Sequence, residues 1–397
     1  MSLLIKDVNL VLPDRVIEGG WLAVKDGVIA DFARGEVPAL ACDEVLEGNG
    51  AYLMPGFVDT HVHGGGGFSF NDETEEAWLT ALRLHLKGGT TTIVPTFTSD
   101  TQESFLKNIA IFNDLKEREE AFSDIPHLAG LHLEGPYFSP QQCGAQAGDI
   151  IRNPNKDEYE EILAACPHIK RWSIACELEG ALEMGQRLKE LGICASIGHS
   201  NATWEEANRA VEEGGYSCVT HLYSSCSSLH RNGPYREGGV VEAAFLMNDL
   251  DVEMIADGVH LPPLFMKLIY KIKGEDHIAM VTDCIRPGGT NYTEGEMVYL
   301  DREKTQRGFL ENRVAVMDTR ACFAGSIATT SRLIRTAILD AGLPIPAAVK
   351  MLTLTPARML GMDDRIGSIE KGKQADLVMM DRNFNLEMCF LNGRAVC

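Results

Sequence analysis

Between positions 56 and 282 the chain repeats one pattern eight times, in which a short apolar segment is followed by a stretch with helical periodicity. Such alternation predicts successive βα units, which assemble into a parallel sheet. The expected strands span residues 56–60, 91–96, 128–133, 171–176, 194–198, 217–222, 252–256 and 278–282. Eight βα units over roughly 300 residues close a (β/α)8 TIM-like barrel, and we predict this α/β fold.

The two ends of the chain follow a different pattern. Residues 1–53 alternate apolar and polar side chains around an Asp26-Gly27 turn, and the tail does the same around Asn392-Gly393. Both dipeptides are strong signals of β-hairpins. Because the tail is too short to fold alone, we expect residues 1–53 and 362–397 to pair into one small β-sandwich domain. The barrel domain, residues 54–361, is then inserted between its two halves.

The charge and cysteine content restrict the partners and the compartment. The chain has 36 Lys+Arg against 57 Asp+Glu, a formal net charge of 36 − 57 = −21, which argues against nucleic-acid or anionic-membrane partners. No apolar run reaches the ~18 residues of a membrane span, and no signal peptide is recognisable. Eleven cysteines without a C-x-x-C pair are typical of a reduced protein, so we expect a cytoplasmic location.

Histidines and acids gather at the carboxyl ends of the expected strands, where barrel enzymes build their active sites. His61 and His63 follow the first strand, and alternate residues of a strand point the same way, which suits two imidazoles on one metal ion. Glu134 ends the third strand and is a candidate bridging ligand, because a carboxylate there needs a cation. His132 is either a hydrogen-bonded core histidine or a support for a metal ligand.

Three further strand ends complete the pattern. His199 ends the fifth strand and His221 the sixth, and with Glu134 they form a strong metal-binding constellation. Asp283 ends the eighth strand, from which its carboxylate can reach a metal-bound water. Nitrogen and oxygen ligands accept Zn, Fe, Co or Mn, so the pattern predicts one or two divalent ions without choosing the metal.

Six motifs carry a resemblance to a known family: HLEGPYFSP at 132–140, IGHSNAT at 197–203, THL at 220–222, ADGVH at 256–260, VTD at 281–283 and FAGS at 323–326. The chain resembles the amidohydrolase superfamily and, within it, the N-acetylglucosamine-6-phosphate deacetylase family. The resemblance implies metal-dependent hydrolysis of the acetamido group of an amino-sugar 6-phosphate. It also implies that Glu134, His199 and His221 bind the main metal, and that His61 and His63 hold a second one with Glu134 bridging.

The resemblance also assigns the remaining roles. Asp283 matches the general base, which takes a proton from a metal-activated water and then passes it to the departing amine. His260 matches a histidine near the substrate phosphate, and the FAGS motif contributes Phe323, Ala324 and Gly325. Arg236 matches an arginine that reaches the substrate phosphate of a neighbouring subunit, which implies a homodimer.

The chain departs from the family at substrate contacts. The family's G-A-H motif is Gly144-Ala145-Gln146 here, and that histidine normally polarises the acetyl carbonyl. A glutamine can donate a hydrogen bond but carries no charge. An Asn-Ala pair in the loop that cradles the phosphate is Ser224-Ser225 here. We therefore expect Ala145, Gln146, Ser224 and Ser225 to contact the substrate within an altered recognition site.

Several alternatives follow from these departures. A paralogue that deacylates N-acetylgalactosamine 6-phosphate, another N-acyl sugar or another small amide stays open, as does a non-catalytic barrel scaffold. An adenosine-deaminase-type site is disfavoured because it lacks a carboxylate ligand on the third strand, where this chain has Glu134. A dihydroorotase- or urease-type site needs a lysine at the end of the fourth strand, and residues 171–176 contain none.

Overall fold

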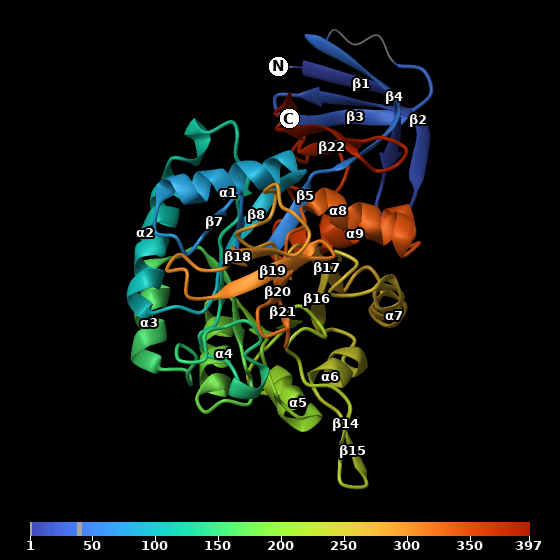
Figure 1. Cartoon of the computed structure of the whole chain (residues 1–397). Coiled ribbons are helices and arrows are strands. Elements are labelled where there is room, and N and C mark those ends of the chain that lie inside the picture. Colours follow the sequence, from blue (N-terminus) through green and yellow to red (C-terminus); the bar gives the residue numbers. More distant parts are fainter. Residues whose placement is uncertain (1, 38–41) are drawn as a thin grey trace.

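A parallel barrel forms the centre of the computed structural model, which describes residues 2–37 and 42–397 (Figure 1). Its strands pair in parallel in chain order. The last strand returns to the first, where the Asp283 N–H donates to the His61 carbonyl at 2.9 Å. The predicted eight-stranded barrel is therefore confirmed. Its strands are β5 (Phe57–Val62), β8 (Thr90–Phe97), β10 (Leu131–Glu134), β11 (Ile169–Ile174), β12 (Cys194–Ile197), β13 (Cys218–Val219), β16 (Asp251–Ile255) and β17 (Ile278–Val281).

Helices between these strands bury one apolar face each against the barrel. In α1 (Glu75–Lys87) the buried face carries Trp78 and Leu82, and the Thr74 side chain caps the first turn by accepting from the Ala77 N–H. Asparagine or threonine caps begin several of the others in the same way. These helices are α2 (Gln102–Glu117), α3 (Lys156–Ala165), α4 (Ala181–Glu190), α5 (Trp204–Glu212), α6 (Val240–Leu246) and α7 (Pro263–Lys273).

The helical region at residues 330–359 is divided into short pieces. Gly342 has φ +63°, and Pro344 lacks the N–H that a continuing helix requires, so the chain turns before α9. The pieces are α8 (Thr330–Arg335), a π-helical turn (Thr336–Asp340), α9 (Ile345–Leu352) and α10 (Leu354–Met359).

The two chain ends form one sheet beside the barrel, as predicted. Its order is β24 (Arg394–Ala395), β23 (Leu386–Leu391), β22 (Leu377–Met380), β4 (Glu44–Pro55), β1 (Ser2–Val11), β2 (Val16–Lys25) and β3 (Val28–Arg34). The tail strand β22 pairs antiparallel with β4, and these strands enclose an apolar core that includes Ile5, Leu22 and Leu377. The exact domain limits, 1–53 plus 362–397 against 54–361, stay a prediction.

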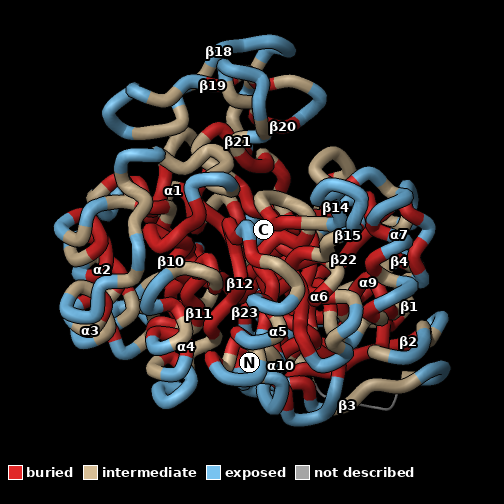
Figure 2. The backbone as a smooth tube through the Cα atoms, turned by 90° about the horizontal axis from the view of Figure 1, so that it is seen from below, coloured by how far each residue is buried: buried red, intermediate tan, exposed pale blue. Residues whose placement is uncertain are grey.

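A four-stranded antiparallel sheet after β17 is absent from the sequence-based expectations. It consists of β18 (Glu296–Tyr299), β19 (Arg307–Glu311), β20 (Val314–Met317) and β21 (Phe323–Ser326). Figure 2 shows β18, β19 and β20 standing out from the buried body of the barrel. Because this sheet, the lid sheet below, follows the eighth strand, it lies over the end of the barrel where the predicted site residues sit.

The remaining elements are short. A hairpin of β14 (His230–Asn232) and β15 (Tyr235–Glu237) protrudes from the barrel in Figure 1. The others are β6 (Gly64–Gly65), β7 (Phe68–Ser69), β9 (His127–Leu128) and two 3-10 turns (Glu119–Ala121 and Pro140–Gln142). In the described part of the chain, no helix combines the length and apolar composition that a membrane span requires.

Candidate metal centre and active site

Three predicted site residues lie just beyond strand ends in an unusual backbone conformation. His199, His221 and Asp283 each stand two residues after β12, β13 and β17, with φ of +48°, +28° and +48°. Few residues other than glycine adopt this left-handed region, and where they do the strain is characteristic of functional sites. The turn at His221 also explains why the sixth strand is shorter than the expected 217–222.

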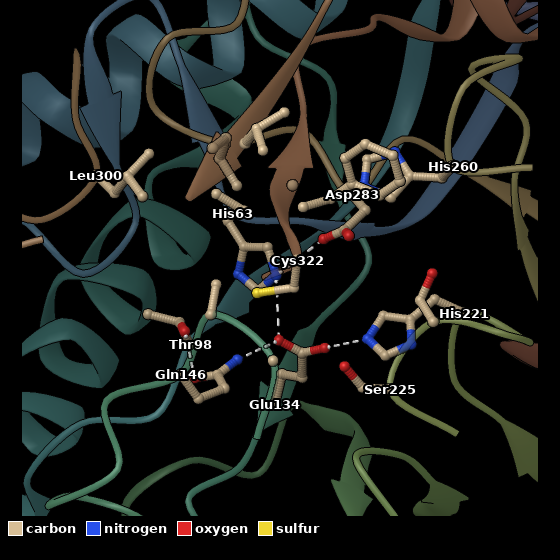
Figure 3. A pocket seen from close by; sticks show the side chains of 18 of the residues that line it. His63, Thr98, Glu134, Gln146, His221, Ser225, His260, Asp283, Leu300 and Cys322 are labelled. Carbon is tan, nitrogen blue, oxygen red and sulfur yellow. Dashed lines mark hydrogen bonds and ion pairs between the residues drawn. The ribbon is translucent and has the colours of Figure 1, made fainter. Parts of the chain in front are cut away.

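Four imidazoles converge on Glu134, and Figure 3 shows two of them, His63 and His221, beside its carboxylate. Its Oε1 lies 2.8 Å from Nε2 of His221 and 3.3 Å from Nε2 of both His199 and His61. Its Oε2 lies 3.3 Å from Nε2 of His63. All five side chains are nearly inaccessible to solvent. The structure thus brings together the five residues that the sequence predicts as metal ligands.

Asp283 faces the same cluster from the eighth strand. Its Oδ1 lies 3.2 Å from Nε2 of His63 and 3.6 Å from Nε2 of His61. Burial would raise the pKa of the Asp283 carboxyl, but the His63 hydrogen bond and the two nearby imidazoles outweigh burial and lower it. In the same way, burial opposes the charge on His63, yet Asp283 and Glu134 raise its pKa to about 9.

The donor set fits divalent metal ions. His61, His63 and Glu134 form one group of ligand atoms within 4.8 Å of each other, and Glu134, His199 and His221 form another. Nε2 of His61 lies only 3.2 Å from Nε2 of His63, a spacing that two lone-pair nitrogens tolerate when they share a cation. Buried nitrogen and carboxylate ligands with a shared Glu134 therefore suit one ion or a bridged pair.

His132 does not join this cluster by hydrogen bonding. Its Nε2 lies 2.7 Å from the Ser173 hydroxyl and its Nδ1 3.3 Å from that of Thr96. The ring is fully buried and packs edge-on against His61, with ring centroids 4.5 Å apart. Of the two interpretations left open by the sequence, the hydrogen-bonded core histidine is the one that its polar contacts favour.

A cavity of about 490 Å³ opens above the candidate metal ligands. Its walls include Glu134, His63 and Asp283 on one side and the lid sheet on the other. Eight of the nine residues predicted to contact substrate line it, namely Ala145, Gln146, Ser224, Ser225, His260, Phe323, Ala324 and Gly325. The cavity is thus large enough for a small-molecule substrate, which would lie against the candidate metal ligands.

Gln146 is held in one orientation at the edge of the cluster. Its Oε1 accepts from the Thr98 hydroxyl at 2.7 Å and from the Ser99 N–H at 3.0 Å. Its Nε2 must then face the other way, and it donates to Oε2 of Glu134 at 3.0 Å. One amide hydrogen therefore steadies Glu134, which is a contact that the sequence comparison with the family does not predict.

His260 is oriented toward the cavity by a buried aspartate. Its Nδ1 lies 2.8 Å from Oδ2 of Asp257, and its ring centroid lies 4.6 Å from that of Phe323. Burial opposes ionisation of Asp257, but the His260 hydrogen bond outweighs it and lowers the pKa of Asp257. Because Asp257 occupies Nδ1, Nε2 of His260 is the nitrogen left for a ligand.

Arg236 does not line this cavity. It lies on β15 of the protruding hairpin and is exposed. The sequence analysis also missed several residues that do line it, including Leu300, Gln306, Arg320 and Cys322 of the lid region. The apolar residues of FLE at 309–311 and VAVM at 314–317 indicate β-strands, but this pattern does not predict that the strands cover the cavity.

Comparison with known proteins agrees with this geometry. The model of the Amidohydrolase family matches residues 52–396. This chain belongs to the amidohydrolase family. It is therefore a hydrolase of a family that uses divalent metals, and its two His/Glu groups are the candidate ligands.

Relatives of this amidohydrolase include two kinds of amino-sugar deacetylase. An N-acetylglucosamine-6-phosphate deacetylase of Lysinibacillus sphaericus is 30% identical, with 99% of this chain and 97% of that protein covered. An N-acetylgalactosamine-6-phosphate deacetylase of Escherichia coli O157:H7 is also 30% identical, covering 95% and 96%. The structure of the Mycobacterium smegmatis N-acetyl-D-glucosamine-6-phosphate deacetylase, solved with that sugar phosphate, matches with a TM-score of 0.87 at 29% identity, covering 100% and 99%.

Proposed function

We propose that this amidohydrolase hydrolyses the acetamido group of N-acetylglucosamine 6-phosphate to give glucosamine 6-phosphate and acetate. The observation that carries the proposal is the convergence of four imidazole Nε2 atoms on Glu134 at the floor of the cavity, with Asp283 beside two of them, His61 and His63. We assign Glu134, His199 and His221 to one divalent ion, and His61 and His63, with Glu134 shared, to a second.

The chain's own residues account for the proton transfers. A divalent ion held by these residues would lower the pKa of a nearby water from 15.7 to ~7 and would polarise the acetyl carbonyl. Because the pKa of Asp283 is lowered, its carboxylate is ionised at neutral pH and can take the proton of the attacking water. An amine leaves readily only when it is protonated, and Asp283 then supplies the same proton to the sugar nitrogen.

Recognition of the sugar phosphate falls to the cavity wall. Nε2 of His260 is available to the phosphate because Asp257 occupies its Nδ1. Ser224 and Ser225 offer hydroxyl groups from the loop after β13. Gln146 supports Glu134 and has a second amide hydrogen that is free to donate to the acetyl oxygen.

We also propose that Arg236 serves the site of a second copy of the chain in a homodimer. Five of the six strand residues of the β14–β15 hairpin are exposed, and an isolated two-stranded hairpin is marginally stable in water, so a partner surface would support it. Mixing the Asp283→Asn variant with the Arg236→Ala variant tests this, because a mixed dimer regains one site with both residues. Recovery of activity on mixing supports the exchange, and a mixture no more active than its components contradicts it.

The direct test is acetate release by metal-loaded enzyme from four sugars: N-acetylglucosamine and N-acetylgalactosamine, each with and without the 6-phosphate. Turnover of N-acetylglucosamine 6-phosphate well above that of the other three sugars supports the proposal. A second candidate, deacetylation of N-acetylgalactosamine 6-phosphate, is favoured by the relative of that activity at equal identity. Faster turnover of N-acetylgalactosamine 6-phosphate would establish this second function instead.

A further inference from the structure

A buried ion pair lies beside the metal ligands, and neither of its residues was singled out from the sequence. Arg171 on β11 donates from Nη1 to Oε1 of Glu253 on β16, and both side chains are buried, at 4% and 0% exposure. The same Nη1 lies 3.5 Å from the Thr60 hydroxyl. Buried ion pairs often contribute no more to stability than apolar residues of similar volume. Stability alone therefore gives little reason for this pair.

The other oxygen of Glu253 points to the metal cluster. Its Oε2 lies 2.9 Å from Nδ1 of His61 and accepts from the backbone N–H of His221 at 3.3 Å. Because a carboxylate paired with arginine is ionised and can only accept, His61 carries its hydrogen on Nδ1. Its Nε2 then presents a lone pair toward Glu134 and His63, as a metal ligand must.

The two metal groups differ in this respect. Nδ1 of His199 has its own partner, the backbone carbonyl of Gln142 at 2.9 Å. Of His221, Glu253 contacts only the backbone N–H. The tautomers of His199 and His221 therefore do not depend on Glu253. His61, in contrast, has Glu253 as the acceptor for its Nδ1.

We propose that Glu253, held in place by Arg171, is a positioning residue that fixes His61 in the tautomer able to bind the second metal ion. The inference rests on the proposed function in taking His61, His63 and Glu134 as a metal site. A carboxylate that accepts from the far nitrogen of a ligating histidine fixes the ring and raises its basicity, and its loss typically weakens metal binding ~10–100-fold.

Two double variants isolate this hydrogen bond. Arg171→Met/Glu253→Met removes both charges and leaves Nδ1 of His61 without an acceptor. Arg171→Met/Glu253→Gln also removes both charges, but its amide oxygen can still accept from Nδ1 of His61. Neither variant leaves an unpaired buried charge, so both are expected to fold, which thermal unfolding of the metal-free proteins checks.

The measurement is stepwise Co²⁺ binding, followed by visible absorption and by metal analysis after dialysis. We expect wild type to bind two ions, and the Met/Met variant to bind the second one ~10–100-fold more weakly while keeping the first. The Met/Gln variant should recover most of the second-site affinity. The partly exposed ion pair of Arg187 and Glu160, on helices outside the barrel strands, provides the matched control, since Arg187→Met/Glu160→Met should bind both ions like wild type.

Equal second-site affinity in the Met/Met and Met/Gln variants would overturn the proposal, because only the Met/Gln variant retains an acceptor for Nδ1 of His61. Wild type that binds a single Co²⁺ would overturn it as well. Either result is separate from the proposed function, because acetate release by wild type is measured independently and one-metal hydrolysis needs only Glu134, His199 and His221. Conversely, the loss and recovery of the second ion can be observed in an enzyme that acts on a different amide.

Discussion

Histidines meet carboxylates at both ends of the barrel, but in different arrangements. At the carboxyl end, four imidazoles share Glu134 and open into a cavity. At the amino end, His127 begins β9, and its Nδ1 lies 3.7 Å from Oε1 of Glu119 while its Nε2 lies 3.4 Å from Oδ2 of Asp376. The Glu134 cluster brings the lone pairs of several ligand atoms together, whereas the His127 contacts join segments that are distant in the chain. Histidine and carboxylate side chains therefore form the candidate active site at the carboxyl end of the barrel and stabilise the fold at the amino end.

The amino-end contacts connect the terminal sheet to the barrel. Asp376 comes immediately before β22, and its backbone carbonyl accepts from the Gly56 N–H at 2.8 Å, where β4 leads into β5. Glu119 also accepts from the Leu128 N–H at 2.7 Å. Substitutions at this end should thus change stability and leave the chemistry intact, and substitutions at the carboxyl end should do the reverse.

The largest expected effect is at Asp283. Asp283→Asn removes the proton acceptor, so kcat for acetate release should fall ~10²–10⁴-fold. The metal content should stay at the wild-type value because none of the five proposed ligands is altered. Kinetics and metal analysis, with exposed Asp364→Asn as the matched control, test this. More than a tenth of wild-type kcat in Asp283→Asn would remove this residue from the mechanism.

Gln146 tests whether the support of Glu134 matters to the chemistry. Gln146→Ala deletes the amide that donates to Oε2 of Glu134 and leaves Thr98 and Ser99 without their acceptor. A hydrogen bond to a charged group contributes ~1.5–3 kcal/mol, so kcat should fall about 10–100-fold. Gln146→Glu, which places a second carboxylate against Glu134, should lose more. Unchanged kcat in Gln146→Ala would make this contact incidental.

His127 gives the corresponding test at the amino end. Burial opposes its charge, but Asp376 and Glu119 outweigh burial and raise the pKa of His127 to about 10, from 6.5. A raised pKa stabilises the fold fully below pH 6.5, and this contribution is lost as the pH rises toward 10. His127→Gln should therefore lower the free energy of unfolding by ~1–3 kcal/mol at pH 6 and by less at pH 9.

Urea unfolding of wild type and His127→Gln at both pH values measures this difference. The comparison between the variants cancels the other groups that titrate over the same range. The kcat of the variant should equal that of wild type at pH 7. A destabilisation that is the same at pH 6 and pH 9 would show that the charge of His127 does not hold the tail to the barrel.

The smallest expected effect is on the lid sheet. Phe323 is 41% exposed, and its ring lies against His260 at the cavity wall. Phe323→Ala should raise KM about 2–10-fold, the equivalent of an aromatic contact of ~0.5–1.5 kcal/mol, and leave kcat unchanged. Phe309→Ala, on β19 outside the cavity lining, is the matched control. If kcat of Phe323→Ala fell as far as that of Gln146→Ala, the lid sheet would contribute to the chemical step and not only to substrate binding.

The cluster of candidate metal ligands was predictable because the ends of the barrel strands are predictable. Residues at the carboxyl ends of barrel strands all lie at the same end of the barrel. The sequence alone therefore predicts that His199, His221 and Asp283 lie close together. Glu253 could not, because it lies in the middle of β16 and its partners Arg171 and His61 are contributed by strands elsewhere in the barrel. A buried acid within a strand has no local signal that names its partner.

The sequence by itself determined the barrel, the pairing of the two chain ends and the identity of the proposed metal ligands, because each follows from periodicity or from strand-end position. Tertiary structure alone decided where Gln146 donates, how Glu253 sets the tautomer of His61 and where the lid sheet lies. These are contacts between segments distant in the chain. Their geometry depends on atomic distances that no local sequence pattern encodes.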